Sequence, residues 1–201
     1  MRSFEVTVKS IFVLLVVSVF VFGADKKTDK KESNESAGGA GVIYEANFDE
    51  EDEIDAFVTD FGEVEWKKEG ANKSKGCMKV FNPGESAWIS CEKSVQWNDS
   101  KTVIDFDYFL NGCGTGDFYV MASGTKGKKV RGFVKSAVKG KWAHAQIKAA
   151  YMQYQGVSGK GDTFKNILFV ADGVDKDSKD PHMLIDNIVI KAGGAAKKDQ
   201  E

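Results

Sequence analysis

Two aspartates separated by a single residue, Asp105 and Asp107, form the pair in this chain with the clearest chemical potential. They alternate with apolar residues over 103–110, which predicts a strand with both carboxylates on one face, about 7 Å apart. A carboxylate pair at this spacing can accept hydrogen bonds from hydroxyl groups, or serve as the acid and base of a glycosidase. The sequence favours hydroxyl binding or a solvated strand face over hydrolysis.

Two further predicted strands place polar side chains opposite an apolar set. In 142–149, His144 and Gln146 alternate with small and aliphatic residues, and in 130–135, Arg131 does the same. Planar hydrogen-bonding groups of this kind bind sugar hydroxyls. We therefore take these three residues, together with the aspartate pair, as candidate ligand contacts.

Aromatic residues in polar, loop-like surroundings complete the candidate ligand site. Trp97, Tyr151 and Tyr154 lie in such segments, where an aromatic ring is explained either by packing or by a ligand. Flat rings stack on the apolar face of a pyranose, so these three residues are further candidate contacts. Trp66 and Trp88 lie within strand patterns and are expected in the core.

The sequence does not favour a zinc site or a catalytic cysteine. The chain has three cysteines, Cys77, Cys91 and Cys113, and two histidines, without the spacing of a zinc site or of a Cys–His nucleophile. Pairing of Cys77 with Cys91 across a hairpin is compatible with an exported protein, and an odd count leaves at least one free thiol.

The elements that must position these residues are short strands separated by turns. Glycine-rich, lysine-rich and aspartate-rich turns fall between segments of apolar alternation, and this pattern predicts an all-β domain, a jelly roll or other β-sandwich. An acidic run at 49–57 is expected to form one helical turn. The predicted strands are 42–48, 64–66, 77–81, 87–91, 103–110, 118–122, 130–135, 142–149, 167–171 and 184–190.

The ends of the chain differ from this domain. Residues 1–24 have a basic start, an apolar run and small residues, as in a secretory signal peptide, which predicts a secreted or periplasmic protein. Residues 25–41 form a charged, glycine-containing linker and 193–201 a similar flexible tail, so the β-sandwich domain spans 42–192. No membrane insertion of the mature chain is expected, and the sequence does not indicate an oligomeric state.

The overall charge argues against one class of partner. Lys+Arg 28 against Asp+Glu 30 gives a formal net charge of −2, so no basic field directs the chain to nucleic acid.

Four segments resemble the galactose-binding-like jelly rolls, a group that includes many carbohydrate-binding modules. Residues 43–49 are similar to the opening strand, 76–80 to the second strand, 139–147 with its Gly-x-Trp start to a middle strand, and 184–188 to the closing strand. The resemblance covers about 43–190 and implies a jelly-roll β-sandwich that binds glycan.

The resemblance also implies a structural calcium ion where the first and last strands meet. On this basis Glu45 and Asn47 match the opening ligand pair, Asp186 matches the closing acid, and Asp49 is a substitute. Asn47 stands where an acid is usual, which lowers the expected charge of the site. Alternatively, Asp186 and its neighbour Asn187 satisfy backbone groups at the end of the sheet.

Together these observations favour an exported, non-catalytic domain whose partner is a glycan or polysaccharide. Two alternatives remain open: a structural or protein-interaction β-sandwich of the cell envelope, and a small glycan hydrolase or lyase.

Overall fold

The structure is a computed structural model, and the predicted signal peptide at 1–24 lies outside the residues it describes. Within the described part no helix is long and apolar enough to cross a membrane. The described residues are 41–59, 62–81, 86–93, 95–97, 101–124, 128–155 and 163–191.

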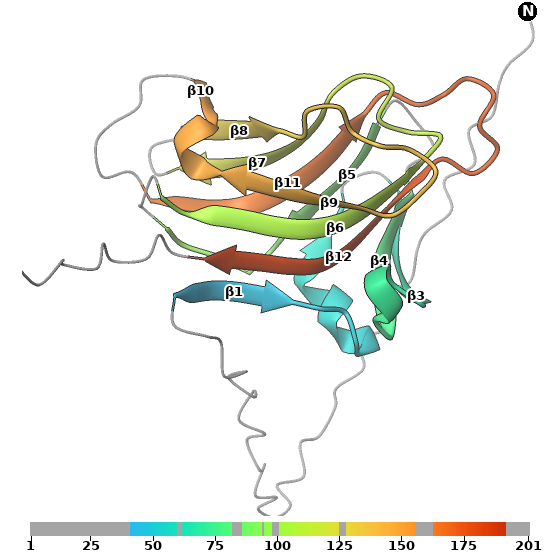
Figure 1. Ribbon diagram of the computed structural model, residues 1–201, viewed down its shortest axis with the longest axis horizontal. Coiled ribbons are helices and arrows are strands. Elements are labelled where there is room, and N and C mark those ends of the chain that lie inside the picture. Colours follow the sequence, from blue (N-terminus) through green and yellow to red (C-terminus); the bar gives the residue numbers. More distant parts are fainter. Residues whose placement is uncertain are drawn as a thin grey trace, which may run out of the picture. The chain divides into compact units, whose positions relative to one another are not determined.

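Two antiparallel sheets of six strands each form the domain (Figure 1). The first sheet has the order β3-β4-β12-β6-β9, and β1 pairs with β12 beside this path. It therefore joins the first and last strands of the domain. Its members are β1 (Val42–Ala46), β3 (Glu63–Lys68), β4 (Gly76–Phe81), β6 (Val103–Asn111), β9 (Ala143–Lys148) and β12 (His182–Lys191).

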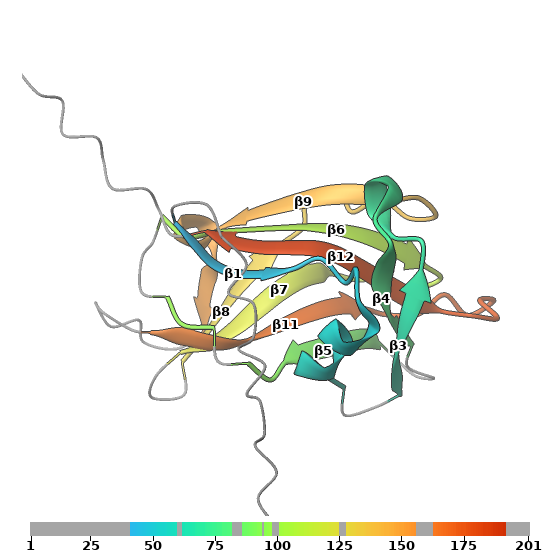
Figure 2. The same cartoon turned by 90° about the horizontal axis from the view of Figure 1, so that it is seen from below.

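The second sheet has the order β10-β8-β7-β11-β5-β2. Seen from below, β7, β11 and β5 form a layer under β1, β12 and β6 (Figure 2). The members of this sheet are β2 (Phe57–Val58), β5 (Ser86–Cys91), β7 (Phe118–Gly124), β8 (Lys129–Phe133), β10 (Gln153–Gln155) and β11 (Phe164–Asp172). Short 3-10 helices lie at Glu51–Ala56 (η1), Ala71–Lys73 (η2) and Ala149–Tyr151 (η4).

The predicted β-sandwich is confirmed, and every strand expected from the sequence is present. The acidic run at 49–57 forms its helical turn as η1. Two strands were not predicted, β2 and β10, because two or three residues are too few for alternation to be recognised.

The core fills the space between the sheets. Alternation along β6 turns Ile104, Phe106 and Leu110 inward, each fully buried. The Phe106 ring packs edge-on against Phe118 of β7 at 6.0 Å and Phe169 of β11 at 5.0 Å between centroids. Burying one such side chain stabilises the fold by roughly 1.5–3 kcal/mol. The same alternation leaves each sheet an outer face, and these two faces carry Asp105, Asp107, His144, Gln146 and Arg131.

Candidate functional site

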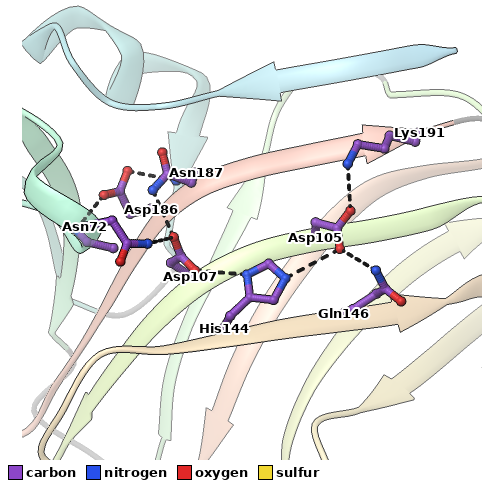
Figure 3. Close-up of polar contacts among 9 residues, drawn as sticks. Asn72, Asp105, Asp107, His144, Gln146, Asp186, Asn187 and Lys191 are labelled. Carbon is purple, nitrogen blue, oxygen red and sulfur yellow. Dashed lines mark hydrogen bonds and ion pairs between the residues drawn. The ribbon is translucent and has the colours of Figure 1, made fainter. Parts of the chain in front are cut away.

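Four of the predicted ligand contacts meet on the outer face of the first sheet (Figure 3). In the antiparallel register of β6 and β9, Asp105 lies opposite Gln146 and Asp107 lies opposite His144. Gln146 Nε2 donates to Asp105 Oδ1 at 2.9 Å, and His144 Nδ1 lies 2.9 Å from Asp107 Oδ1. The sequence predicted these four residues, and strand pairing brings them together. We call this group the carboxylate face.

Asp107 is held by two amides as well as by His144. Asn187 Nδ2 donates to Asp107 Oδ2 at 2.9 Å, and Asn72 Nδ2 donates to the same oxygen at 3.3 Å. Asn187 lies in a bulge of β12, where the register shifts between Asp186 and Val189 and the Asn187 φ is 49°. Asparagine tolerates this left-handed conformation better than most residues, which fits its use at the bulge.

The carboxylate oxygens of Asp105 also have partners within the protein. Lys191 Nζ donates to Asp105 Oδ2 at 3.1 Å, and His144 Nε2 lies 3.6 Å from the other carboxylate oxygen. Asp105 and Asp107 are only 8% and 6% exposed. Because their oxygens are buried and already accept hydrogen bonds, the two carboxylates orient His144 and Gln146 from beneath.

A cleft of about 690 Å³ opens between β8 and β9. Three predicted contacts line it, His144 and Gln146 from β9 and Tyr151 from η4. Phe133 and Gln153, from β8 and β10 of the second sheet, line its other side. Tyr151 is 79% exposed, so its ring is accessible. Side chains from both sheets therefore line the same cleft.

Arg131 lies apart from the two aspartates, on the outer face of the second sheet. Its guanidinium carbon is 4.3 Å from the centroid of the Tyr119 ring and 5.9 Å from that of Phe133. The Tyr119 and Phe133 rings are 5.7 Å apart. Arg131 Nε is buried and has no hydrogen-bond partner among the described residues. Burial raises the pKa of the Tyr119 phenol above its ordinary value of 10.0.

Trp88 lies on this same outer face and lines a groove of about 530 Å³. Its expected place in the core is wrong, because Ala87, Ile89 and Cys91 are the buried set of β5 and Trp88 alternates with them. Strict alternation along 87–91 could have assigned Trp88 to the outer face. We call Trp88, Tyr119, Arg131 and Phe133, with the groove, the aromatic face. The groove is also lined by Val58, Ser90, Ser123, Asn166 and Leu168.

The two remaining aromatic candidates do not join these groups. Trp97 is 5% exposed and packs in the core, with its ring centroid 5.7 Å from that of Phe164. Its ring therefore serves packing. Tyr154 lies on β10, where its backbone pairs with Val130, and its side chain is outside the described part.

Two of the residues matched to calcium lie together at the end of β1. Asn47 Nδ2 donates to Asp49 Oδ2 at 3.4 Å, and the backbone N–H of Asp49 lies 3.3 Å from Asn47 Oδ1. Asp49 also accepts a hydrogen bond from the Lys75 backbone N–H at 3.0 Å, and Lys75 Nζ lies 3.9 Å from it. Glu45 lies on β1 opposite Val189. The Lys75 ammonium group and the amide donors of Asn47 and Lys75 already satisfy the Asp49 carboxylate.

The fourth residue, Asp186, is fully buried and surrounded by donors. Its Oδ2 accepts the backbone N–H of Ala71 at 2.8 Å and the hydroxyl of Ser74 at 2.5 Å, and its Oδ1 accepts the N–H of Asn187 at 2.7 Å. Gly70 permits this approach, since a Cβ there would lie 2.2 Å from Oδ2.

Calcium needs six to eight oxygen ligands, whereas N–H and O–H groups point at Asp186. Among the described residues no group of three or more His, Cys, Asp or Glu side chains is placed to hold a metal ion. The donors around Asp186 and Asp49 therefore do not fit a calcium ion at these two carboxylates. Burial raises the pKa of the Asp186 carboxyl, although the hydrogen bonds from Ser74, Ala71 and Asn187 oppose this.

The cysteines do not form the disulfide that the sequence allowed. Cys77, Cys91 and Cys113 are free and buried. Cys77 lies on β4 of the first sheet and Cys91 on β5 of the second, so the two strands are not paired as the hairpin hypothesis required. Desolvation raises the pKa of Cys77 to about 12 and that of Cys113 to about 11, and it raises the pKa of Cys91 as well.

Known structures share the fold of this chain, but their sequences are only weakly similar to it. No family model matches the chain. No curated protein matches it either.

Several solved structures share its architecture. An exo-β-agarase is 12% identical with a TM-score of 0.54, over 80% of this chain and 26% of that one. The CBM22-1–CBM22-2 tandem domain of Paenibacillus barcinonensis Xyn10C is 20% identical with a TM-score of 0.50, over 83% and 49%. A xylan-binding domain from CBM22 is 15% identical with a TM-score of 0.50, over 78% and 97%. The chain therefore has the jelly-roll fold of carbohydrate-binding modules.

Proposed function

We propose that this protein binds a polysaccharide on its aromatic face and does not cleave it. The observation that carries the proposal is a row of three aromatic rings across the second sheet. In the strand register, Trp88 lies opposite Val170, Val170 opposite Tyr119, and Tyr119 opposite Phe133. Strands are spaced about 4.8 Å apart, so the three rings form a row perpendicular to the strands, in which the Tyr119 and Phe133 rings are tilted by 54° to each other.

Polar groups accompany the rings, as recognition of hydroxyl groups requires. Arg131 extends between Tyr119 and Phe133, and its Nε lacks a partner among the described residues. Ser90 and Asn166 line the groove next to Trp88. Rings that stack on the apolar face of a sugar, beside donors and acceptors for its hydroxyls, favour a glycan over a purely apolar ligand.

The state of the carboxylates favours binding over hydrolysis. Acid and base catalysis requires carboxyl groups that reach the glycosidic bond. Asp105 and Asp107 are buried and hydrogen-bonded to the protein's own donors, and they lie on the opposite sheet from the aromatic face. The jelly-roll fold, shared with a xylan-binding domain, supports the same proposal. Export through the predicted segment 1–24 would bring the protein to extracellular polysaccharides.

Affinity electrophoresis of the full chain through gels that contain soluble polysaccharides tests this proposal. Trp88→Ala is expected to weaken binding about tenfold or more, since a central aromatic contact contributes about 1.4 kcal/mol or more. Trp142→Ala is the matched control, because Trp142 is a half-buried tryptophan that packs against Phe109 on the first sheet.

We expect a gel with the bound polysaccharide to retard the wild type and Trp142→Ala. The same gel should not retard Trp88→Ala. If the wild type migrates alike in gels with and without each polysaccharide, the proposal fails. The alternative of a protein-interaction domain then takes its place.

A further inference from the structure

We infer that the cleft between β8 and β9 binds carboxylate groups of the polysaccharide, so that the preferred ligand is an acidic, uronate-bearing glycan. This inference rests on the proposed function, because it names the ligand class and places part of the ligand in the cleft.

The charge of the cleft carries the inference. Two lysines, Lys135 and Lys148, are among the residues that line it, and both are exposed. No acidic residue is found among the lining residues that the structure describes. Asp105 and Asp107 lie beneath Gln146 and His144 but are buried and hydrogen-bonded within the protein, so the two lysines are the charged side chains that the lining of the cleft exposes.

Neither lysine has a carboxylate partner among the residues that the structure describes. Other lysines of the domain lie beside carboxylates, as Lys79 does beside Asp180 at 3.3 Å and Lys191 beside Asp105 at 3.1 Å. No such ion pair involves Lys135 or Lys148 in the described part of the chain. An ammonium group at a protein surface attracts a nearby carboxylate more strongly than it would in bulk water.

The cleft also adjoins the aromatic face. Phe133 belongs to both, since it lines the cleft and lies beside Tyr119 and Arg131. Gln153 lines the cleft and pairs with Arg131 across β8 and β10. A chain that follows the row of rings past Phe133 therefore reaches the cleft.

Within the cleft, neutral groups are arranged to bind sugar hydroxyls around the lysines. Gln146 and His144 are held in place by Asp105 and Asp107, and Tyr151 exposes its ring. Hydrogen-bonding amides, an accessible ring and two exposed ammonium groups together match a sugar that carries a carboxylate.

Matched pairs of polysaccharides test the inference with the full chain. Polygalacturonate, alginate and glucuronoxylan are each compared with their own carboxyl-reduced form, which keeps the backbone and removes the charge. The acidic member of at least one pair is expected to bind about tenfold or more tightly at low salt, and the difference should shrink at high salt.

Two double variants with the same loss of charge locate the effect. Lys135→Gln/Lys148→Gln is expected to abolish the preference for the acidic form while retaining binding of the reduced form. Lys176→Gln/Lys179→Gln, in the loop before β12, should keep the preference. Equal binding of acidic and reduced forms by the wild type overturns the inference and leaves the proposed function intact. If both double variants lose the preference for the acidic form equally, the inference is also overturned and the proposed function stays intact. If no polysaccharide binds at all, the proposed function itself fails.

Discussion

Asp107 and His144 face each other across β6 and β9, with His144 Nδ1 2.9 Å from the Asp107 carboxylate. The two side chains differ in burial, because the Asp107 side chain is 9% exposed whereas the His144 side chain is 60% exposed. Asp107→Ala leaves the donors of Asn72 and Asn187 without their acceptor, and we expect it to lower the free energy of unfolding by about 2–3 kcal/mol.

His144→Ala, by contrast, should cost less than about 1 kcal/mol, since little of its surface is buried. Urea denaturation of the two variants beside the wild type measures both values. Equal losses would show that Asp107 does not organise the carboxylate face.

Asp186 makes the stability depend on pH in a defined direction. Burial raises its pKa above the ordinary value of 3.8, so the folded chain holds this proton more tightly than the unfolded chain does. The stability that Asp186 contributes is therefore fully present below pH 3.8 and declines as the pH rises through the raised pKa. The difference in unfolding free energy between wild type and Asp186→Ala should be larger near pH 4 than near pH 7. A difference that grows with pH would contradict this assignment.

Removal of calcium should leave the domain unchanged. Asp186 accepts hydrogen bonds from Ala71, Ser74 and Asn187, so both of its carboxylate oxygens already have donors. A ligand that binds only the folded state raises its stability. The melting temperature is therefore expected to be the same in EDTA and in millimolar calcium. A rise of several degrees with calcium would show that a cation site exists after all.

The three thiols should be unreactive in the folded protein. All are buried, and desolvation raises the pKa of Cys77 to about 12 and of Cys113 to about 11, which keeps them as thiols at neutral pH. An aromatic disulfide reagent should label none of them in buffer and all three in guanidinium. Rapid labelling of the native protein, or labelling of only one thiol after unfolding, would contradict free and buried cysteines.

Alternation within strands made much of the fold predictable. Along β6 and β9 it separated the core side chains from the aspartates, His144 and Gln146, because the side-chain period of a strand does not depend on its partners. Which strands are neighbours was not predictable, since pairing depends on contacts far apart in sequence. For that reason Arg131 could not be separated from the aspartates, and Cys77 could not be placed in a different sheet from Cys91.

Local context misled the prediction for the tryptophans. Trp97 lies in a polar segment yet packs in the core against Phe164, because an isolated antiparallel bridge joins it to that residue, which is far away in the sequence. Trp88 lies within a strand yet faces outward, since a strand has two faces and only one of them meets the core. The donors around Asp186 could not be predicted from the sequence either, because Ala71 and Ser74 lie more than a hundred residues before it in the chain.

The central claim, that the aromatic face binds glycan, can be tested by following the indole N–H signals of the four tryptophans by NMR during titration with an oligosaccharide of a bound polysaccharide. We predict that the Trp88 signal shifts with saturable dependence on ligand, while the signals of the core residue Trp97 and of Trp142 on the opposite sheet stay in place. A shift of Trp142 with Trp88 unmoved would place the ligand on the wrong sheet and contradict the claim.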